Sequence, residues 1–123
     1  MKRIFISFAI EDVKYRDFMV AQAKNTKSPF EFVDMSVKEP WKTDWKVRCR
    51  VKIKGCDGVI ALISKNTPNA SGEIFEIGCA YEYDIPVMLM YINNDRPILP
   101  TPLSGKKVYL WTWDNIKNFI TSL

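Results

Sequence analysis

Chemistry in this chain must rest on carboxylates, hydroxyls, thiols, lysine, arginine or aromatic rings, because none of its 123 residues is a histidine. The absence of histidine excludes catalytic dyads and triads built on an imidazole, zinc sites of the HExxH type and haem ligation by histidine. No metal site is expected. The search for function therefore turns to acidic, hydroxyl and aromatic side chains and to the elements that would bring them together.

Ten such residues lie near the ends of predicted strands or on the helix that follows one: Ser7, Phe8, Asp12, Asp34, Ser36, Trp41, Ser64, Asn66, Thr67 and Glu76. Each also has a purely structural interpretation. Ser7 and Phe8 could simply end a strand and fill the core. Asp12 and Thr67 suit helix caps. Glu76 lies off the apolar stripe of Ile74 and Ile77 on a helical wheel, a pattern that by itself favours a solvated position.

Predicted strands and helices alternate along the chain. Apolar and β-branched runs predict strands at 2–8, 30–33, 57–64, 86–92 and 107–110. Helices are predicted at about 13–27, from 67 or 71 to about 84 with a core stripe through Ile74, Ile77, Tyr81 and Ile85, and from a cap at Asp114 onward. This order predicts an α/β fold, a doubly wound parallel sheet with helices on both faces, in a single domain of residues 1–123. Ligands of such sheets bind at the carboxyl ends of the strands.

The first strand end lacks the glycines of a phosphate-binding loop. Its residues, SFAIED, fit neither GxGxxG nor GxxxxGK[ST], so classical dinucleotide-binding and P-loop sites are not expected. Glu11 and Asp12 would suit the magnesium-binding acids of a response-regulator receiver. That class also needs a phosphate-accepting aspartate at the end of the third strand, where this chain has Ser64.

Residues 41–54 fit two periods. Apolar residues from Trp45 to Ile53 alternate with basic ones, which favours a strand with one basic face. Trp41, Trp45, Cys49 and Ile53 also fall at the i, i+4 spacing of a helical stripe. The basic face is either a solvated surface or a patch for nucleic acid or an acidic partner.

The sequence predicts a cytoplasmic protein. The three cysteines (Cys49, Cys56 and Cys79) form no CxxC pair and are odd in number, so we expect buried thiols rather than a disulfide framework or a zinc site. No signal peptide or membrane-spanning run is expected. The net charge of +4 is compatible with nucleic acid or with small anionic ligands.

Four segments in order resemble the TIR-like domain family of bacteria and archaea, in particular the stand-alone TIR type (ThsB) of Thoeris anti-phage defence. They are KRIFISFAIEDVKYR, FEFVDMSVKEPW, IKGCDGVIALISKNT and SGEIFEIGCAYEYDIPVMLMYI, which together span about residues 2–92. The resemblance implies a flavodoxin-like, five-stranded parallel sheet and a helix at about 41–54.

The resemblance also implies an activity and a site. TIR enzymes of this kind cleave the nicotinamide–ribose bond of NAD, which is their substrate, and need no cofactor. The matching catalytic carboxylate is Glu76. Ser7 and Phe8 would line the nicotinamide side, Asp34, Ser36 and Trp41 would belong to a loop over the site, and Ser64 and Thr67 would border it. Where many members have a tryptophan shortly before this glutamate, the chain has Gly72-Glu73-Ile74, and Glu73 is a second candidate.

Three functions follow for testing. The first is an NAD hydrolase or ADP-ribose cyclase that makes a signalling nucleotide in anti-phage defence, sensed by a separate effector protein. The second is a catalytically silent TIR-like module that works by self-association. The third, less favoured, is a nucleic-acid binder that uses the basic face of residues 42–54; no membrane partner is expected.

Overall fold

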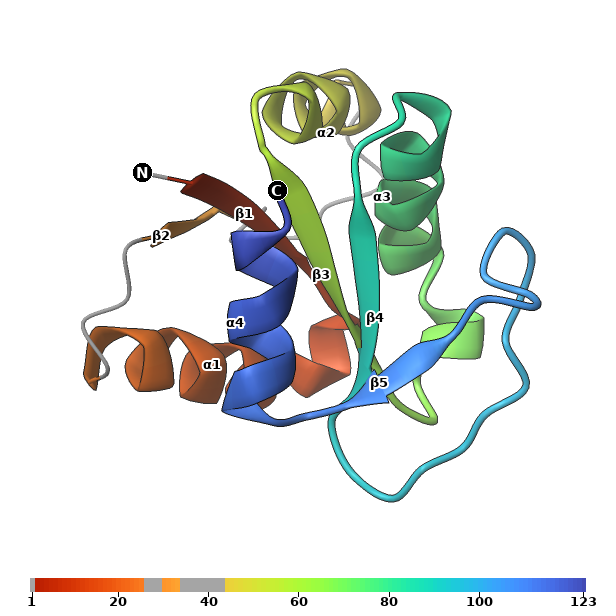
Figure 1. The fold of residues 1–123 in the computed structure, drawn as a ribbon. Coiled ribbons are helices and arrows are strands. Elements are labelled where there is room, and N and C mark those ends of the chain that lie inside the picture. Colours follow the sequence, from red (N-terminus) through yellow and green to blue (C-terminus); the bar gives the residue numbers. More distant parts are fainter. Residues whose placement is uncertain (1, 26–29, 34–43) are drawn as a thin grey trace.

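Five parallel strands form the centre of the molecule. The structure is a computed structural model that describes residues 2–25, 30–33 and 44–123. The strands are β1 (Lys2–Ser7), β2 (Phe30–Val33), β3 (Gly58–Ile63), β4 (Val87–Tyr91) and β5 (Val108–Leu110), in the order β2-β1-β3-β4-β5 (Figure 1). Every neighbouring pair is parallel. The predicted α/β fold with a doubly wound parallel sheet is confirmed.

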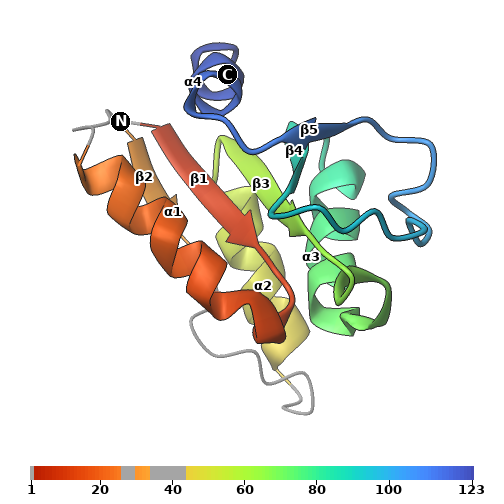
Figure 2. The same ribbon diagram turned by 90° about the horizontal axis from the view of Figure 1, so that it is seen from below.

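Helices cover both faces of this sheet (Figure 2). They are α1 (Val13–Asn25), α2 (Trp45–Lys54), α3 (Ser71–Glu82) and α4 (Trp113–Thr121), with short 3-10 turns at Ile10–Asp12 and Thr67–Asn69. Successive strand residues point to opposite faces. Ile4 and Ile6 therefore pack with α1 and α4, whereas Phe5 packs with α2 and α3.

The central strand β3 is the most deeply buried, and its neighbour β4 is also largely buried. All six residues of β3 are buried, as are the three middle residues of β4. Uninterrupted apolar runs suit strands that are covered on both sides, because neither face meets water. The uninterrupted apolar runs at 57–64 and 86–92 thus fall on the central strand β3 and on its neighbour β4.

The ambiguous segment is a helix from Trp45 to Lys54. Trp45, Cys49 and Ile53 are buried against β1, β3 and α3, so the i, i+4 stripe decides the structure. The strand interpretation of this segment is wrong. In the helix the basic residues lie on the solvent side, together with the exposed Val47 and Val51. In the helix, Arg48 pairs with Asp44 at 3.4 Å, while the ammonium of Lys54 lies 4.5 Å from the ring centroid of Tyr83.

The structure corrects the three cap assignments. Thr112, not Asp114, caps α4 by accepting a hydrogen bond from the backbone N–H of Asn115. The side chains of Asp12 and Thr67 bond instead to residues at the end of β3, as described below. The helix starts were predicted to within a few residues, but the side chains that were predicted to cap them were wrong.

The buried stripe of α3 also differs from the prediction. Ile77 is buried as predicted, but Ile74, Tyr81 and Ile85 are only partly covered. The buried face runs instead through Glu73, Glu76, Ile77 and Ala80. The surface position that the helical wheel favoured for Glu76 is therefore wrong, because the stripe with the largest apolar side chains is not the stripe that faces the sheet.

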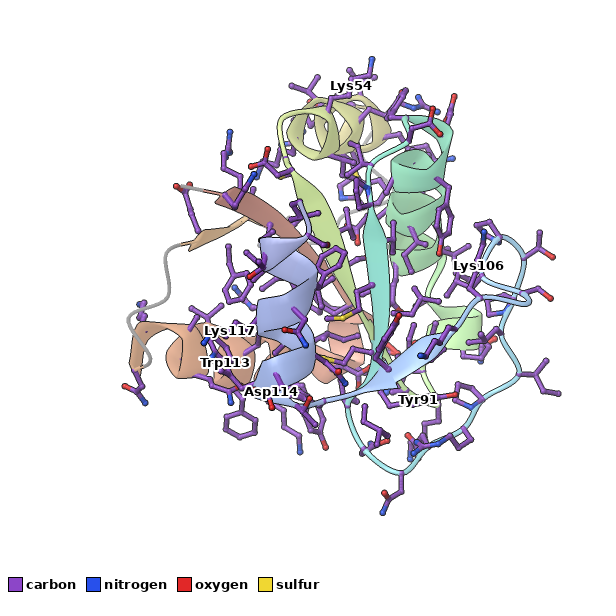
Figure 3. The ribbon with its side chains drawn as sticks, in the orientation of Figure 1. Lys54, Tyr91, Lys106, Trp113, Asp114 and Lys117 are labelled. Atoms are coloured by element: carbon purple, nitrogen blue, oxygen red, sulfur yellow. The ribbon has the colours of Figure 1, made fainter. Side chains whose placement is uncertain are left out.

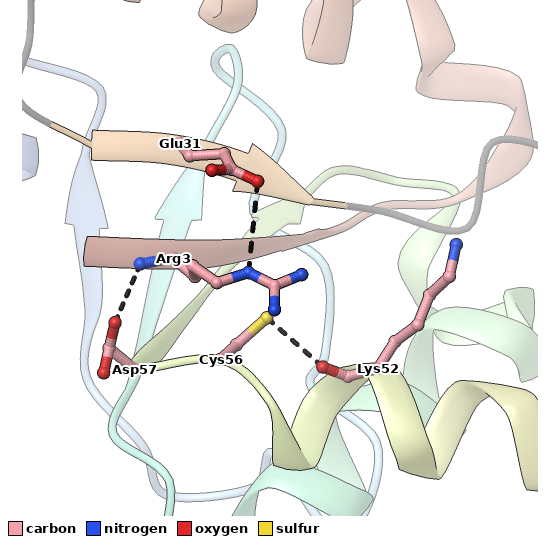
Figure 4. Close-up of polar contacts among 5 residues, drawn as sticks. All are labelled: Arg3, Glu31, Lys52, Cys56 and Asp57. Atoms are coloured by element: carbon pink, nitrogen blue, oxygen red, sulfur yellow. Dashed lines mark hydrogen bonds and ion pairs between the residues drawn. The ribbon is translucent and has the colours of Figure 1, made fainter. Parts of the chain in front are cut away.

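The amino edge of the sheet is closed by a separate set of contacts (Figure 4). The backbone N–H of Arg3 donates to Asp57 at 2.8 Å, and the Arg3 guanidinium lies 4.0 Å from the Glu31 carboxylate. The Cys56 thiol donates to the carbonyl of Lys52. These contacts tie β1 to β2 and to the start of β3. The candidate residues lie at the other end of the strands, at the carboxyl edge of the sheet.

Candidate functional site

A hydrogen bond between Ser7 and Glu76 forms the centre of the candidate site. The Ser7 hydroxyl donates to Oε1 of Glu76 at 2.7 Å, and both side chains are fully buried. The same hydroxyl lies 3.4 Å from the backbone carbonyl of Glu73. A carboxylate held by a hydroxyl away from water has a defined position, and its charge is screened less there than at the surface.

Local sequence explains why these groups meet. Ser7 is the last residue of β1, and its side chain points to the face that α2 and α3 cover. Glu76 is one helical turn into α3 after Glu73, so the two carboxylates share one face of the helix. That face turns toward the end of β1. The structure thus brings the Glu76 carboxylate and the Ser7 hydroxyl together, from segments 69 residues apart.

A second polar cluster joins the β1–α1 connection to the β3–α3 connection. The Asp12 carboxylate accepts from the Ser64 hydroxyl at 2.5 Å and from the Asn66 amide at 2.9 Å. The Thr67 hydroxyl accepts from the backbone N–H of Ser64. Asp12, Ser64 and Thr67 are buried. These bonds fix the turn that leads into α3, and hence the start of the helix that carries Glu76.

Of the other predicted residues, Phe8 lies apart from this centre. Phe8 is fully buried in the core on the α1 and α4 face, with the Arg16 guanidinium 5.6 Å from its ring centroid. Ser7 faces the opposite side of the sheet, so the structure does not bring Phe8 to Glu76. Asp34, Ser36 and Trp41 lie outside the described residues.

A cleft between the N-terminal ends of α2 and α3 was not predicted. It has a volume of about 280 Å³ and is lined by Trp45, Lys46, Ser71, Gly72 and Phe75. Phe75 directly precedes Glu76, and Gly72 lies one turn before it. The i, i+4 stripe of α2 contained Trp45, but only the packing of α2 on α3 shows that a hollow forms there.

The thiols take no part in this site. Cys49, Cys56 and Cys79 are buried and form no disulfide. Burial raises the pKa of the Cys56 thiol, opposed by the charge of Arg3, and burial also raises the pKa of Cys79, opposed by Arg50. A thiol with a raised pKa is a weak nucleophile at neutral pH, because little of it is thiolate.

Among residues 2–25, 30–33 and 44–123, no group of three cysteine, aspartate or glutamate side chains is placed to hold a metal ion. None of the helices in that part of the chain has the length and apolar character that crossing a bilayer requires.

Comparison with known proteins gives one family match. Residues 5–97 match the family model described as "Thoeris protein ThsB, TIR-like domain". This range holds Ser7, the end of β3, the whole of α3 and Glu76. The comparison with curated proteins gives no match.

Solved structures with a similar fold include two from distant sources. One is the TIR domain of the Toll-related receptor TRR-2 from Hydra magnipapillata, with a TM-score of 0.62 and 11% identity over 99% of this chain and 94% of that one. The other is a prokaryotic SEFIR domain, with a TM-score of 0.56 and 16% identity over 99% and 89% of the two chains. At these identities the likeness concerns the fold alone.

Proposed function

The chain belongs to the family of TIR-like domains of the Thoeris protein ThsB, and from this premise we propose that it cleaves NAD to make a signalling nucleotide. The observation that carries the proposal is the Glu76 carboxylate, buried at the carboxyl edge of the sheet and held by the Ser7 hydroxyl. The product would act on a separate effector protein in anti-phage defence. NAD is a substrate here, and the proposal includes no resident cofactor.

One carboxylate suffices for the bond-breaking step in a chain without histidine. The bond between the nicotinamide nitrogen and C1′ of the ribose breaks, and its electron pair leaves with nicotinamide. Nicotinamide departs neutral from a cationic ring, so no general acid is required. Positive charge then develops on C1′ and the ring oxygen. A nearby carboxylate stabilises this charge and can accept hydrogen bonds from the ribose hydroxyls.

The second step decides the product. Water adding at C1′ and losing a proton gives linear ADP-ribose. A hydroxyl of the same ADP-ribose adding there, with loss of its proton, gives a cyclic isomer. The enzyme selects between these outcomes by excluding or admitting water, and a buried carboxylate is suited to exclusion.

Full burial of Glu76 has a consequence for activity. Ribose can reach the carboxylate only after the side chain is uncovered. We therefore assign two forms: a resting form, in which Glu76 is bound to Ser7 and covered, and an active form, in which α3 presents the carboxylate to substrate. A trigger would shift the balance by favouring the second form.

The test is release of nicotinamide from NAD by the purified chain, alone and with lysate of phage-infected cells. Glu82 provides a matched control, since it is an exposed glutamate on the same helix. We expect the unmodified chain and Glu82→Gln to release nicotinamide once triggered, and Glu76→Gln to be silent. Absence of release by the unmodified chain under every condition, infected lysate included, would refute the proposal.

A second candidate function is a catalytically silent module that self-associates. Two observations favour it: Glu76 is covered, and Gly72-Glu73-Ile74 stands where many family members have a tryptophan. This candidate predicts assembly that Glu76→Gln leaves unchanged, without consumption of NAD. The nucleic-acid alternative stays an untested prediction, because Lys46, Arg48, Lys52 and Lys54 remain exposed on α2.

A further inference from the structure

We propose that the outer face of α2 binds an acidic amphipathic helix of another protein. The outer face is the side of the helix turned away from the sheet, and it carries Val47 and Val51 among basic side chains. The opposite side of α2 packs into the core through three buried residues, Trp45, Cys49 and Ile53. The inference goes beyond the proposed function, because it does not depend on NAD cleavage.

The two valines are exposed at positions where a helix on a protein surface usually carries polar residues. Val47 is 59% exposed and Val51 is 67% exposed. They are four residues apart, so they lie one turn apart on the same side of the helix. Valine is a weaker helix former than lysine or arginine, so these two residues add neither burial nor helix propensity to the fold. Their spacing matches the i, i+4 anchors through which one helix binds another.

Basic side chains surround the valines. Half of the ten residues of α2 are basic and none is acidic; the basic residues are Lys46, Arg48, Arg50, Lys52 and Lys54. Lys54 lies on the side of the helix away from the sheet (Figure 3). Asp44, just before the helix, pairs with Arg48 alone, so an excess of positive charge remains. An acidic partner complements this charge, which speeds association and fixes the orientation of the partner.

Three of these cations lie over aromatic rings of α3 or of the residue after it. The Lys46 ammonium and the Arg50 guanidinium each lie 5.2 Å from the Phe75 ring centroid. The Lys54 ammonium lies 4.5 Å from the ring centroid of Tyr83. Cation–π contacts restrict these long side chains. Less conformational entropy is therefore lost when carboxylates of a partner pair with them.

The aromatic side chains beside this face favour a protein over a nucleic acid. Single-stranded nucleic acid binds basic proteins by stacking its bases on accessible rings. Trp45 is buried, and cations already lie over the rings of Phe75 and Tyr83. Phosphate groups gain nothing from the two valines, whereas an apolar stripe on a partner helix would remove them from water. An acidic amphipathic helix satisfies both the charge and the apolar stripe.

The experiment measures binding of a dye-labelled peptide to the full chain by fluorescence anisotropy. The probe is a helical peptide of about five turns, with leucine at i, i+4 spacing and glutamate on both sides of that stripe. Val51→Ser is the test variant, and Val13→Ser, at an exposed valine of α1, is its control. Serine and valine have similar helix propensities, so both helices are retained. We expect saturable binding that weakens with salt, about fivefold weaker in Val51→Ser and less than about twofold weaker in Val13→Ser.

A DNA duplex with the same dye and gel filtration of the chain alone complete the test. Absence of peptide binding, or equal weakening by the two variants, would overturn the proposal. DNA binding that is tighter than peptide binding and unchanged in Val51→Ser would overturn it as well, because the basic residues would then serve a nucleic acid. Oligomers of the chain that Val51→Ser dissociates would make a second copy the occupant instead.

Discussion

At the scale of single residues, the proposed activity depends on Glu76 and on the Ser7 hydroxyl that holds it. Their hydrogen bond of 2.7 Å links the end of β1 to α3 and orients a fully buried carboxylate. Asp12, Ser64 and Thr67 act one step away, because they fix the turn before α3. Removing either member of the central pair should therefore affect both stability and the position of the carboxylate.

The Ser7–Glu76 bond can be measured by a double-mutant cycle. Ser7→Ala leaves a buried carboxylate oxygen without its donor, and we expect it to lower the free energy of unfolding by about 1–3 kcal/mol. In the background of Glu76→Ala the same change should cost less, since the acceptor is gone. Urea denaturation of the four proteins gives the coupling energy. Additive effects would show that the bond contributes nothing.

The sequence predicted the identity of this carboxylate only through the family resemblance. The helical wheel placed Glu76 at the surface, because carboxylates are rarely fully buried and the larger apolar side chains lay on another stripe. A buried polar group at a functional site departs from the general pattern of burial. Periodicity alone therefore could not identify it.

At the scale of elements, α3 is the part that sets the site. It carries Glu73, Glu76 and one side of the cleft, and it ends in a well-formed cap. The N–H of Ile85 donates to the carbonyl of Ala80 at 2.9 Å, and the N–H of Asp84 donates to that of Tyr81. This pair of bonds is a Schellman motif, which requires a left-handed residue at its centre.

Asp84 occupies that left-handed position with a φ of 56°. Glycine adopts this conformation without steric cost, whereas other residues carry a penalty. We predict that Asp84→Gly raises the free energy of unfolding by up to about 1 kcal/mol and that Asp84→Val lowers it. Both values come from urea denaturation. A glycine variant less stable than the original chain would contradict the described cap.

The α2 segment shows what an isolated pattern cannot decide. Trp45 to Lys54 satisfies period two and the i, i+4 spacing together, so the two structures could not be separated from these residues alone. Packing against β1, β3 and α3 buries Trp45, Cys49 and Ile53, and this burial selects the helix. The strands at 57–64 and 86–92 were predictable because a run without polar residues fits few other environments.

At the scale of the whole molecule, the parallel sheet brings the carboxyl ends of the strands to one edge, and helices from both halves of the chain cover its two faces (Figures 1 and 2). The carboxyl edge could be predicted as the site from topology. The cleft could not, because it exists only where two helices that are separate in sequence pack with their N-terminal ends together.

Stability of the whole fold should fall in alkaline solution. Burial raises the pKa of Cys56 and Cys79, so these thiols stay protonated in the folded chain at pH values where they ionise in the unfolded one. The folded state then binds more protons, and stability decreases as pH rises above about 8.5. Tyr81, whose pKa burial also raises, adds to the loss at higher pH.

The measurement is the urea midpoint at pH 8 and at pH 10. The double variant Cys56→Ala, Cys79→Ala serves as control, and we expect its midpoint to fall less between these values than that of the original chain. An equal fall in both proteins would show that other groups cause the alkaline loss.

The central proposal is that the chain cleaves the nicotinamide–ribose bond of NAD and that the Glu76 carboxylate is the catalytic group. Its most direct test is a mass spectrum of the products formed from NAD by the triggered chain, beside Glu76→Gln and the control Glu82→Gln. We predict nicotinamide with an equal amount of linear or cyclic ADP-ribose from the original chain and from the control, and a rate lowered about 10²–10³-fold in Glu76→Gln. Products formed at an unchanged rate by Glu76→Gln would contradict the account.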